Sequence, residues 1–298
     1  MRIEELGEFG LIRRITRSLK ADNSVIKGPG DDCAVIKLDR SSYQLLTCDM
    51  IVEGVDFKPG DKPYLIGRKA LAVSISDIAA CAGIPRYCLV SLGIPKYAPV
   101  KYIDQICRGI FDLAREFRIN VVGGDISRAK QLALDVSMYG VVEKKYLVLR
   151  SGAKPGDIIF VSGSLGDSIK GKHLKFTPRI KEARFLVENF KVSAMTDISD
   201  GLAQDLRHIL EESNAGAVIY ADLLPRHKPS TSLESALYAG EDFELLFTMP
   251  IKEARKMLAS DRDIFHPIGH ITEKRRGLRL IDKDLREKTL APRGYKHF

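Results

Sequence analysis

The sequence predicts a mixed α/β (α+β) fold built as two α/β domains. The chain has 298 residues, enough to form two hydrophobic cores. Short apolar runs typical of strands alternate with amphipathic helical segments in both halves, which favours sheets covered by helices. A stretch rich in Lys, Gly and Pro interrupts this pattern at 144–157. We place the domain boundary at its start, giving domains 1–143 and 144–298.

The first half contains three helical patterns and five strand patterns. Apolar residues recur at helical spacing in three segments, and we predict helices over 9–19, 63–82 and 100–117. Pro63 suits a first helical turn because its missing N–H would have no partner there, and Gly83 suits the end of the same helix. Apolar runs bounded by turn residues predict strands over 33–38, 43–48, 87–94, 119–122 and 132–142.

The second half repeats this arrangement. We predict helices over 178–190 and 201–213. We predict strands over 158–161, 217–220 and 243–248. The stretch Gly166-x4-Gly171-Lys172 resembles a phosphate-binding P-loop, but His173 replaces the Ser or Thr that would bind magnesium. We therefore interpret this stretch as a flexible Gly/Ser loop. His208 lies beside polar residues on a predicted helix, and we expect it at the surface.

Composition argues against a nucleic-acid-binding, a disulfide-bonded and a membrane protein. The net charge of +8 suits small anionic ligands, but the basic residues are spread thinly, so we expect no nucleic-acid partner and a solvated loop at 273–276. Five cysteines, an odd number without a C-x-x-C pair, predict reduced thiols. The N-terminus carries acids and no apolar core, and no apolar run approaches the length of a bilayer. We therefore expect a cytoplasmic protein with no membrane partner.

Aspartates at the ends of apolar runs are the strongest functional signal. The turn Gly28-Pro29-Gly30 leads into Asp31 and Asp32, two like charges that repel unless a cation shares them. Similar junctions hold Asp49, Asp77, Asp125, Asp197 and Asp200. Carboxylates with almost no His or Cys in the same motifs favour Mg²⁺. Metals held by carboxylates neutralise phosphates during phosphoryl transfer. The residues alone therefore predict a Mg²⁺-dependent enzyme acting on phosphates, with Asp-rich surface turns as the alternative.

A longer series of motifs runs in order along almost the whole chain. They are Gly-Asp-Asp-Cys-Ala at 30–34, Asp-x-x-Val-x-Gly at 49–54, Lys-Ala-Leu-Ala-Val-Ser-Ile-Ser-Asp-Ile-Ala-Ala at 69–80, Gly-Gly-Asp at 123–125, Arg-Ser-Gly-Ala-Lys-Pro-Gly-Asp at 150–157, Asp-x-Ser-Asp-Gly-Leu at 197–202, Gly-Glu-Asp-Phe-Glu-Leu at 240–245 and Gly-Tyr-x-His-Phe at the end. With them the chain resembles the thiamine-monophosphate kinase family, of the superfamily that includes aminoimidazole ribonucleotide synthetase. The resemblance implies two α/β domains and a homodimer joined through a β-barrel of N-terminal strands. It also implies ATP-dependent phosphorylation of thiamine monophosphate to thiamine diphosphate.

The resemblance also implies roles for single residues. The implied metal shell for several Mg²⁺ ions is Asp31, Thr47, Cys48, Asp49, Asp77, Asp125, Asp197 and Asp200. The implied ATP contacts are Tyr102, Gly124, Asp125, Arg150 and Ser199. The implied substrate contacts are Asp56 and Glu241, to which we add Tyr295. We predict no catalytic side chain, because direct in-line transfer depends on positioning and charge neutralisation.

Three positions depart from the family's pattern. Cys48 stands in place of a Thr, which is compatible with metal binding through the backbone carbonyl. Asp56 stands where the family often has His, and Pro292 where it often has an aromatic residue. We therefore expect Tyr295 to take part of the aromatic role, since a cationic thiazolium favours an aromatic face.

Two rival classes of function stay open. The first is a sister enzyme of the superfamily. Selenophosphate synthetase needs a reactive Cys near its N-terminus, whereas no Cys precedes Cys33, and the hydrogenase-maturation relative needs a C-terminal Cys, whereas this chain ends His297-Phe298. The second is a non-catalytic nucleotide- or RNA-binding module, which would not need the full set of carboxylates.

Overall fold

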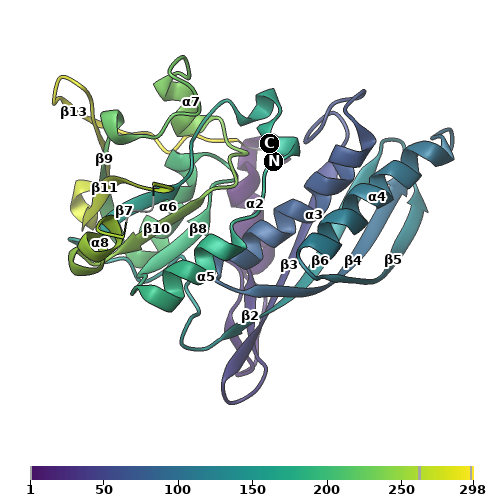
Figure 1. Cartoon of the computed structure of the whole chain (residues 1–298), viewed down its shortest axis with the longest axis horizontal. Coiled ribbons are helices and arrows are strands. Elements are labelled where there is room, and N and C mark those ends of the chain that lie inside the picture. Colours follow the sequence, from purple (N-terminus) through teal and green to yellow (C-terminus); the bar gives the residue numbers. More distant parts are fainter. Residues whose placement is uncertain (1, 261–262, 296) are drawn as a thin grey trace.

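In the computed structural model, which describes residues 2–260, 263–295 and 297–298, two sheets carry helices packed on them (Figure 1). The predicted mixed α/β class is confirmed. Within the described ranges, the first sheet has the strand order β1-β2-β3-β6-β4-β5, and the second has the order β13-β12-β9-β11-β7-β10-β8. The two ends of the chain meet, because the backbone N–H of His297 donates to Glu8 at 3.0 Å.

The first sheet is formed by the first half of the chain. Its strands are β1 (Val25–Lys27), β2 (Ala34–Lys37), β3 (Ser42–Val52), β4 (Ile84–Ile94), β5 (Asn120–Arg128) and β6 (Ala133–Glu143). Only β4 and β5 pair in parallel; the other neighbours are antiparallel. Strands β3 and β6 pair along their whole length, from Ser42 opposite Glu143 to Val52 opposite Ala133.

Helices α3 (Pro63–Ala80) and α4 (Val100–Glu116) cover one face of this sheet (Figure 1). They approach closely at two glycines, since a Cβ atom at Gly67 or Gly109 would lie 1.9 Å from a carbonyl oxygen of the other helix. Helix α3 also contacts α5 (Ile180–Asn189) and β8 (Ala194–Asp197) of the second half. It is therefore buried on nearly all sides, which explains why its sequence is apolar without a single amphipathic stripe.

The opposite face of the first sheet carries exposed apolar side chains. They are Leu46, Met50, Tyr87, Leu89 and Val122. The sheet is open, with β1 and β5 at its edges, and it does not close into a barrel within the described part of the chain.

The second sheet consists of β7 (Ile158–Ser162), β8, β9 (Ala215–Tyr220), β10 (Leu245–Met249), β11 (Phe265–Glu273), β12 (Leu278–Ile281) and β13 (Glu287–Thr289). Helices α6 (Leu202–Ser213) and α7 (Leu233–Tyr238) pack into one core with Ile159 and Leu246. Helices α5 and α8 (Ile251–Leu258) pack into another, where the rings of Phe160 and Phe247 stack at 5.4 Å. Successive side chains of β7 and β10 thus point to opposite faces of the second sheet and contribute to both of its hydrophobic cores.

The predicted elements are present with shifted bounds. Of the N-terminal helices α1 (Ile3–Leu6) and α2 (Glu8–Thr16), the second ends before the predicted residue 19. The strand predicted over 119–122 continues to Arg128, so Gly123-Gly124-Asp125 lies inside β5 and not after it. All five cysteines are free, as expected. No helix of the described residues is long and apolar enough to cross a membrane.

Several helices and strands, and the burial of His208, were not predicted. The missed elements are α1, α7, α8, β1, β8, β11, β12 and β13. Strand β11 is interrupted by Pro267, where its pairing register shifts, and β8 is only four residues long, so neither shows a clear alternation. The surface position expected for His208 is wrong. Its ring is half-buried against Phe9, and burial lowers its pKa to about 4.

Candidate active site

Strand β3 and helix α3 place two carboxylates next to each other. Successive side chains of a strand point to opposite faces, so Thr47 and Asp49 face α3 while Cys48 faces the open side of the sheet. The Thr47 hydroxyl donates to Asp77 at 2.5 Å, and the Ser74 hydroxyl donates to Asp49 at 2.8 Å. The Cys48 thiol therefore points away from these carboxylates, which leaves only its backbone for a metal.

The second sheet brings a third carboxylate to α3. Asp197 ends β8 and accepts a hydrogen bond of 2.5 Å from the Ser76 hydroxyl. Carboxylate oxygens of Asp32, Asp77 and Asp197 all lie within 4.8 Å of one another. Three converging carboxylates from separate parts of the chain form a ligand set suited to a hard divalent cation. We call these three residues the carboxylate triad.

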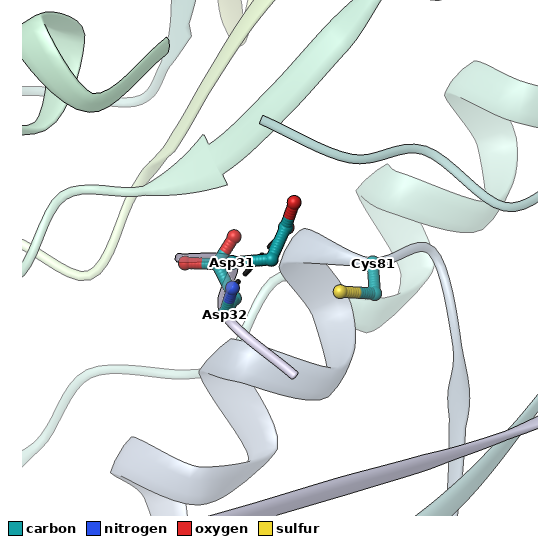
Figure 2. A group of neighbouring side chains, drawn as sticks. All are labelled: Asp31, Asp32 and Cys81. Atoms are coloured by element: carbon teal, nitrogen blue, oxygen red, sulfur yellow. Dashed lines mark hydrogen bonds between the residues drawn. The ribbon is translucent and has the colours of Figure 1, made fainter. Parts of the chain in front are cut away.

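Of the two adjacent aspartates, Asp32 joins the triad and Asp31 lies beside it. One oxygen of Asp32 accepts from Arg150 at 2.6 Å and from Thr196 at 2.8 Å, while the other is buried without a partner. Asp31 instead accepts the backbone N–H of Arg150 at 3.2 Å and lies beside the Cys81 thiol (Figure 2). Asp32, which the sequence-based metal shell did not include, is therefore the triad member, and the predicted role of Asp31 as a metal ligand stays a prediction.

Burial and mutual repulsion raise the pKa values of these carboxyl groups. Burial raises the pKa of Asp197 to about 7, and the charge of Asp32 adds to the effect. Burial likewise raises the pKa of Asp31 to about 7 and that of Asp49 to about 6. For Asp77, burial followed by the charges of Asp49 and Asp197 raises the pKa well above its usual range. The cluster carries more negative charge than it can hold alone, and a divalent cation would relieve it.

Asp200 and Ser199 lie on the turn that follows β8. The carboxylate of Asp205 accepts the backbone N–H groups of Asp200 at 3.1 Å and Gly201 at 3.0 Å, which fixes this turn. Burial raises the pKa of Asp200 to about 6. Asp200 and Ser199 line a neighbouring cavity instead of joining the triad.

That cavity has a volume of about 210 Å³ and is lined by all three residues predicted to contact substrate, Asp56, Glu241 and Tyr295. Lys69 also lines it with a side chain only 1% exposed. Its ammonium group donates to Glu241 at 2.5 Å and to the Asp56 carbonyl oxygen at 2.6 Å. The second oxygen of Glu241 has no partner. Asp49 lines the cavity too, so the cavity adjoins the carboxylates around α3.

Asp125 lies apart from the triad within one chain. The pairing register places Asp125 opposite Ser91, Asp135 and Met50 in turn across the sheet. Asp49 is one residue before Met50, so its side chain lies on the other face, about three strand spacings or ~14 Å away. The expected convergence of Asp125 with Asp49 and Asp77 is therefore not found within a single chain.

The predicted ATP contacts are divided in the same way. Gly124 is exposed on β5 beside Asp125, and Tyr102 lies on α4, packed against the first core. Arg150 is bound to Asp32, and Ser199 lies at the cavity. Of the five predicted ATP contacts, Arg150 and Ser199 therefore lie near the carboxylates, whereas Gly124, Asp125 and Tyr102 lie on β5 and α4.

Comparisons with known proteins agree with this arrangement. Models of the AIR synthase related protein family match the chain, the N-terminal domain at residues 30–142 and the C-terminal domain at 154–281. A thiamine-monophosphate kinase of Bacillus subtilis (strain 168) is 35% identical over 98% of this chain and all of that relative. One of Aquifex aeolicus (strain VF5) is 33% identical, with both chains fully covered. The chain belongs to the thiamine-monophosphate kinase family.

Solved structures of this family share the fold of the whole chain. The structure described as "AaThiL complexed with AMPPCP and TMP" superposes with a TM-score of 0.88 at 32% identity, covering 100% of this chain and 99% of that one. Thiamine Monophosphate Kinase from Aquifex Aeolicus superposes with a TM-score of 0.80 at 30% identity, covering 97% and 100%.

Three residues of the site were missed by sequence reasoning. Asp32 was visible as half of an acidic pair, but the sequence does not show which half turns inward. Lys69 stood within a motif of the thiamine-monophosphate kinase family, yet a lysine on a helix gives no sign of burial. Asp205 follows Asp200 by five residues, and only the folded turn shows that its carboxylate holds that backbone.

Proposed function

We propose that this protein transfers the terminal phosphoryl group of ATP to the phosphate of thiamine monophosphate, giving ADP and thiamine diphosphate. The observation that carries the proposal is the carboxylate triad of Asp32, Asp77 and Asp197, placed beside a cavity that holds a buried Lys69–Glu241 pair. Two phosphates that react with each other repel, and cations held by carboxylates relieve that repulsion. The family membership of the chain supports the same acceptor.

Mg²⁺, when bound, supplies charge neutralisation between the two reacting phosphates. The triad, together with Asp49, offers the oxygen ligands for such ions, and Asp31 and the Cys48 carbonyl oxygen would extend that shell. Arg150 is held by Asp32 and Thr196 at hydrogen-bond distance, so its guanidinium is preorganised for an anionic group. We assign no nucleophile from the protein, and direct in-line transfer follows from that assignment.

Glu241, Asp56 and Tyr295 are proposed to bind the thiamine portion in the adjoining cavity. The free oxygen of Glu241 offers a negative charge to a cationic thiazolium. Tyr295 is 40% exposed and lines the same cavity, which leaves its ring available for stacking.

A homodimer is proposed to complete the site. The apolar side chains on the open face of the first sheet would be buried by a second copy, whose strands would continue the sheet into a barrel. Edge strand β5 carries Gly124 and Asp125, and the neighbouring helix α4 carries Tyr102. All three belong to the domain formed by 1–143 and lie away from the triad of their own chain. We propose that they serve the phosphates and ATP bound at the triad and at Asp200 of the partner subunit, in a cytoplasmic enzyme.

The decisive experiment is an assay of purified protein with ATP, Mg²⁺ and thiamine monophosphate. Thiamine diphosphate should form in amounts equal to ADP, and chelation of Mg²⁺ should abolish both. ATP hydrolysis without thiamine diphosphate would favour a sister enzyme with another acceptor. Binding of ATP without any turnover, or salt-resistant binding of RNA, would favour a non-catalytic module.

A further inference from the structure

The cavity has an apolar wall that the family motifs do not explain. Besides Lys69 and Glu241, the cavity is lined by apolar side chains that include Val55 and Ile169. Ile169 belongs to the segment 163–176, which contains the stretch from Gly166 to Lys172 interpreted above as a flexible Gly/Ser loop. The segment contains two short 3₁₀ turns, η1 (Ser168–Lys170) and η2 (Lys172–Leu174). The Ile169 side chain in η1 is 50% exposed, whereas Ser168 and His173 of the two turns are buried.

The segment 163–176 is held in place and is not a free loop. The buried carboxylate of Asp242 accepts the backbone N–H of Gly166 at 3.0 Å and also the Ser168 hydroxyl. The carboxylate of Glu244, itself buried, accepts from Lys172 at 2.8 Å. At the end of the segment, the Phe176 ring stacks on Phe243 at 4.1 Å between centroids.

These anchors are three consecutive residues of one motif. Glu241 faces the cavity and binds Lys69, while Asp242, Phe243 and Glu244 hold the segment. The motif therefore holds both Glu241 and the segment that carries Ile169, two parts of the lining of one cavity. The backbone N–H of Gly166 is already bound to a carboxylate, which argues against a phosphate at this P-loop-like stretch.

We propose that the segment 163–176 contributes Ile169 to the apolar lining of the acceptor site and that Ile169 determines specificity by contacting the ring system of the acceptor. The inference rests on the proposed function, since a flat heteroaromatic ring needs an apolar surface opposite the carboxylate that binds its charge. Asp242 is a positioning residue, because it acts on the acceptor only through the segment it holds.

The test compares Ile169→Ala with Ile251→Ala, a matched control at a 51% exposed isoleucine outside the cavity. Ile169→Ala should raise the KM for thiamine monophosphate about three- to tenfold, less than for an enclosed pocket because the side chain is half exposed. The KM for ATP and kcat should stay within twofold. Ile169→Phe, which fills the cavity, should raise the same KM further.

A graded series tests the anchor. Asp242→Asn keeps one accepting oxygen and Asp242→Ala keeps none, so the KM for thiamine monophosphate should rise more in the second variant while the KM for ATP stays unchanged. Thermal melts identify variants that fail to fold, and for these the Ile169 variants decide. An unchanged KM for thiamine monophosphate in both Ile169 variants overturns the inference and leaves the proposed function intact. Absence of thiamine monophosphate turnover in the wild-type protein overturns both.

Discussion

Removal of metal should make the protein less stable at higher pH. Burial raises the pKa of Asp31 and of Asp197 to about 7. In the unfolded chain these groups have lost their protons near pH 4, so between pH 4 and 7 the folded state binds more protons than the unfolded state. The corresponding stability is fully present below pH 4 and is lost as the pH rises through 7.

The size of the effect follows from these values. From pH 6 to pH 8, a carboxyl group with a folded-state pKa of about 7 lowers the free energy of unfolding by about 1 to 2 kcal/mol, so Asp31 and Asp197 together lower it by about 3 kcal/mol. His208 works in the opposite sense, because its folded-state pKa of about 4 favours folding as the pH rises through 6.5. Asp49 and Asp200, with pKa values of about 6, roughly cancel that contribution.

Urea unfolding in the presence of a chelator measures this directly at pH 6, 7 and 8. Mg²⁺ at 100 times its Kd should restore about 2.7 kcal/mol at pH 8. Asp32→Asn should reduce the loss with pH, because Asp32 raises both pKa values, whereas Asp222→Asn at an exposed position should not change it. A metal-free protein that is as stable at pH 8 as at pH 6 would refute the reasoning.

Four further outcomes are expected. Asp77→Asn should stay folded but lose at least about 100-fold in kcat, as for a group that stabilises only the transition state; near-wild-type turnover at saturating Mg²⁺ would contradict this. Mixing Asp77→Asn with Asp125→Asn subunits should recover about a quarter of the wild-type activity, since half of the dimers would contain one intact shared site; no recovery would place Asp125 in its own chain's site. Lys69→Met should cost about 2–4 kcal/mol in urea unfolding by leaving Glu241 buried without its partner, and adding Glu241→Gln should recover part of that loss; an additive double variant would show that the pair is not coupled. Tyr295→Ala should raise the KM for thiamine monophosphate by an amount corresponding to about 0.5–2 kcal/mol, with a smaller change in kcat; an unchanged KM in a folded variant would remove Tyr295 from the site.

Local sequence patterns predicted the longer helices and most of the strands, and they singled out several of the carboxylates that lie around α3. Helices such as α3 and α4 were predictable because apolar spacing reports burial over many residues. Asp77 and Asp197 were predictable as site residues because a carboxylate within an apolar run needs a partner or a cation. Short strands such as β8 were not, since four residues give no period to measure.

Contacts between distant residues could not be predicted from the sequence. Asp31 and Asp32 are equivalent as neighbours in a turn, and only the fold shows that the guanidinium of Arg150 binds Asp32 while its backbone N–H binds Asp31. Lys69 lies 172 residues from its partner Glu241, so nothing near it in the sequence shows that its charge is buried. The placement of Asp125 depends on the strand register, which the sequence specifies only through the complete sheet.

Helix α3 connects the cation site to the acceptor cavity through its own hydrogen bonds. Because the helix is buried on nearly all sides, each polar side chain on it must find a partner in the surrounding protein. Lys69 meets Glu241, Ser74 meets Asp49 and Ser76 meets Asp197. Lys69 and Asp77 are eight residues apart, which on a rigid helix is about 12 Å along the axis. Helix α3 would thus hold the acceptor cavity at Lys69 and the cation site at Asp77 at a fixed separation. A kink in α3 should therefore impair acceptor binding and cation binding together.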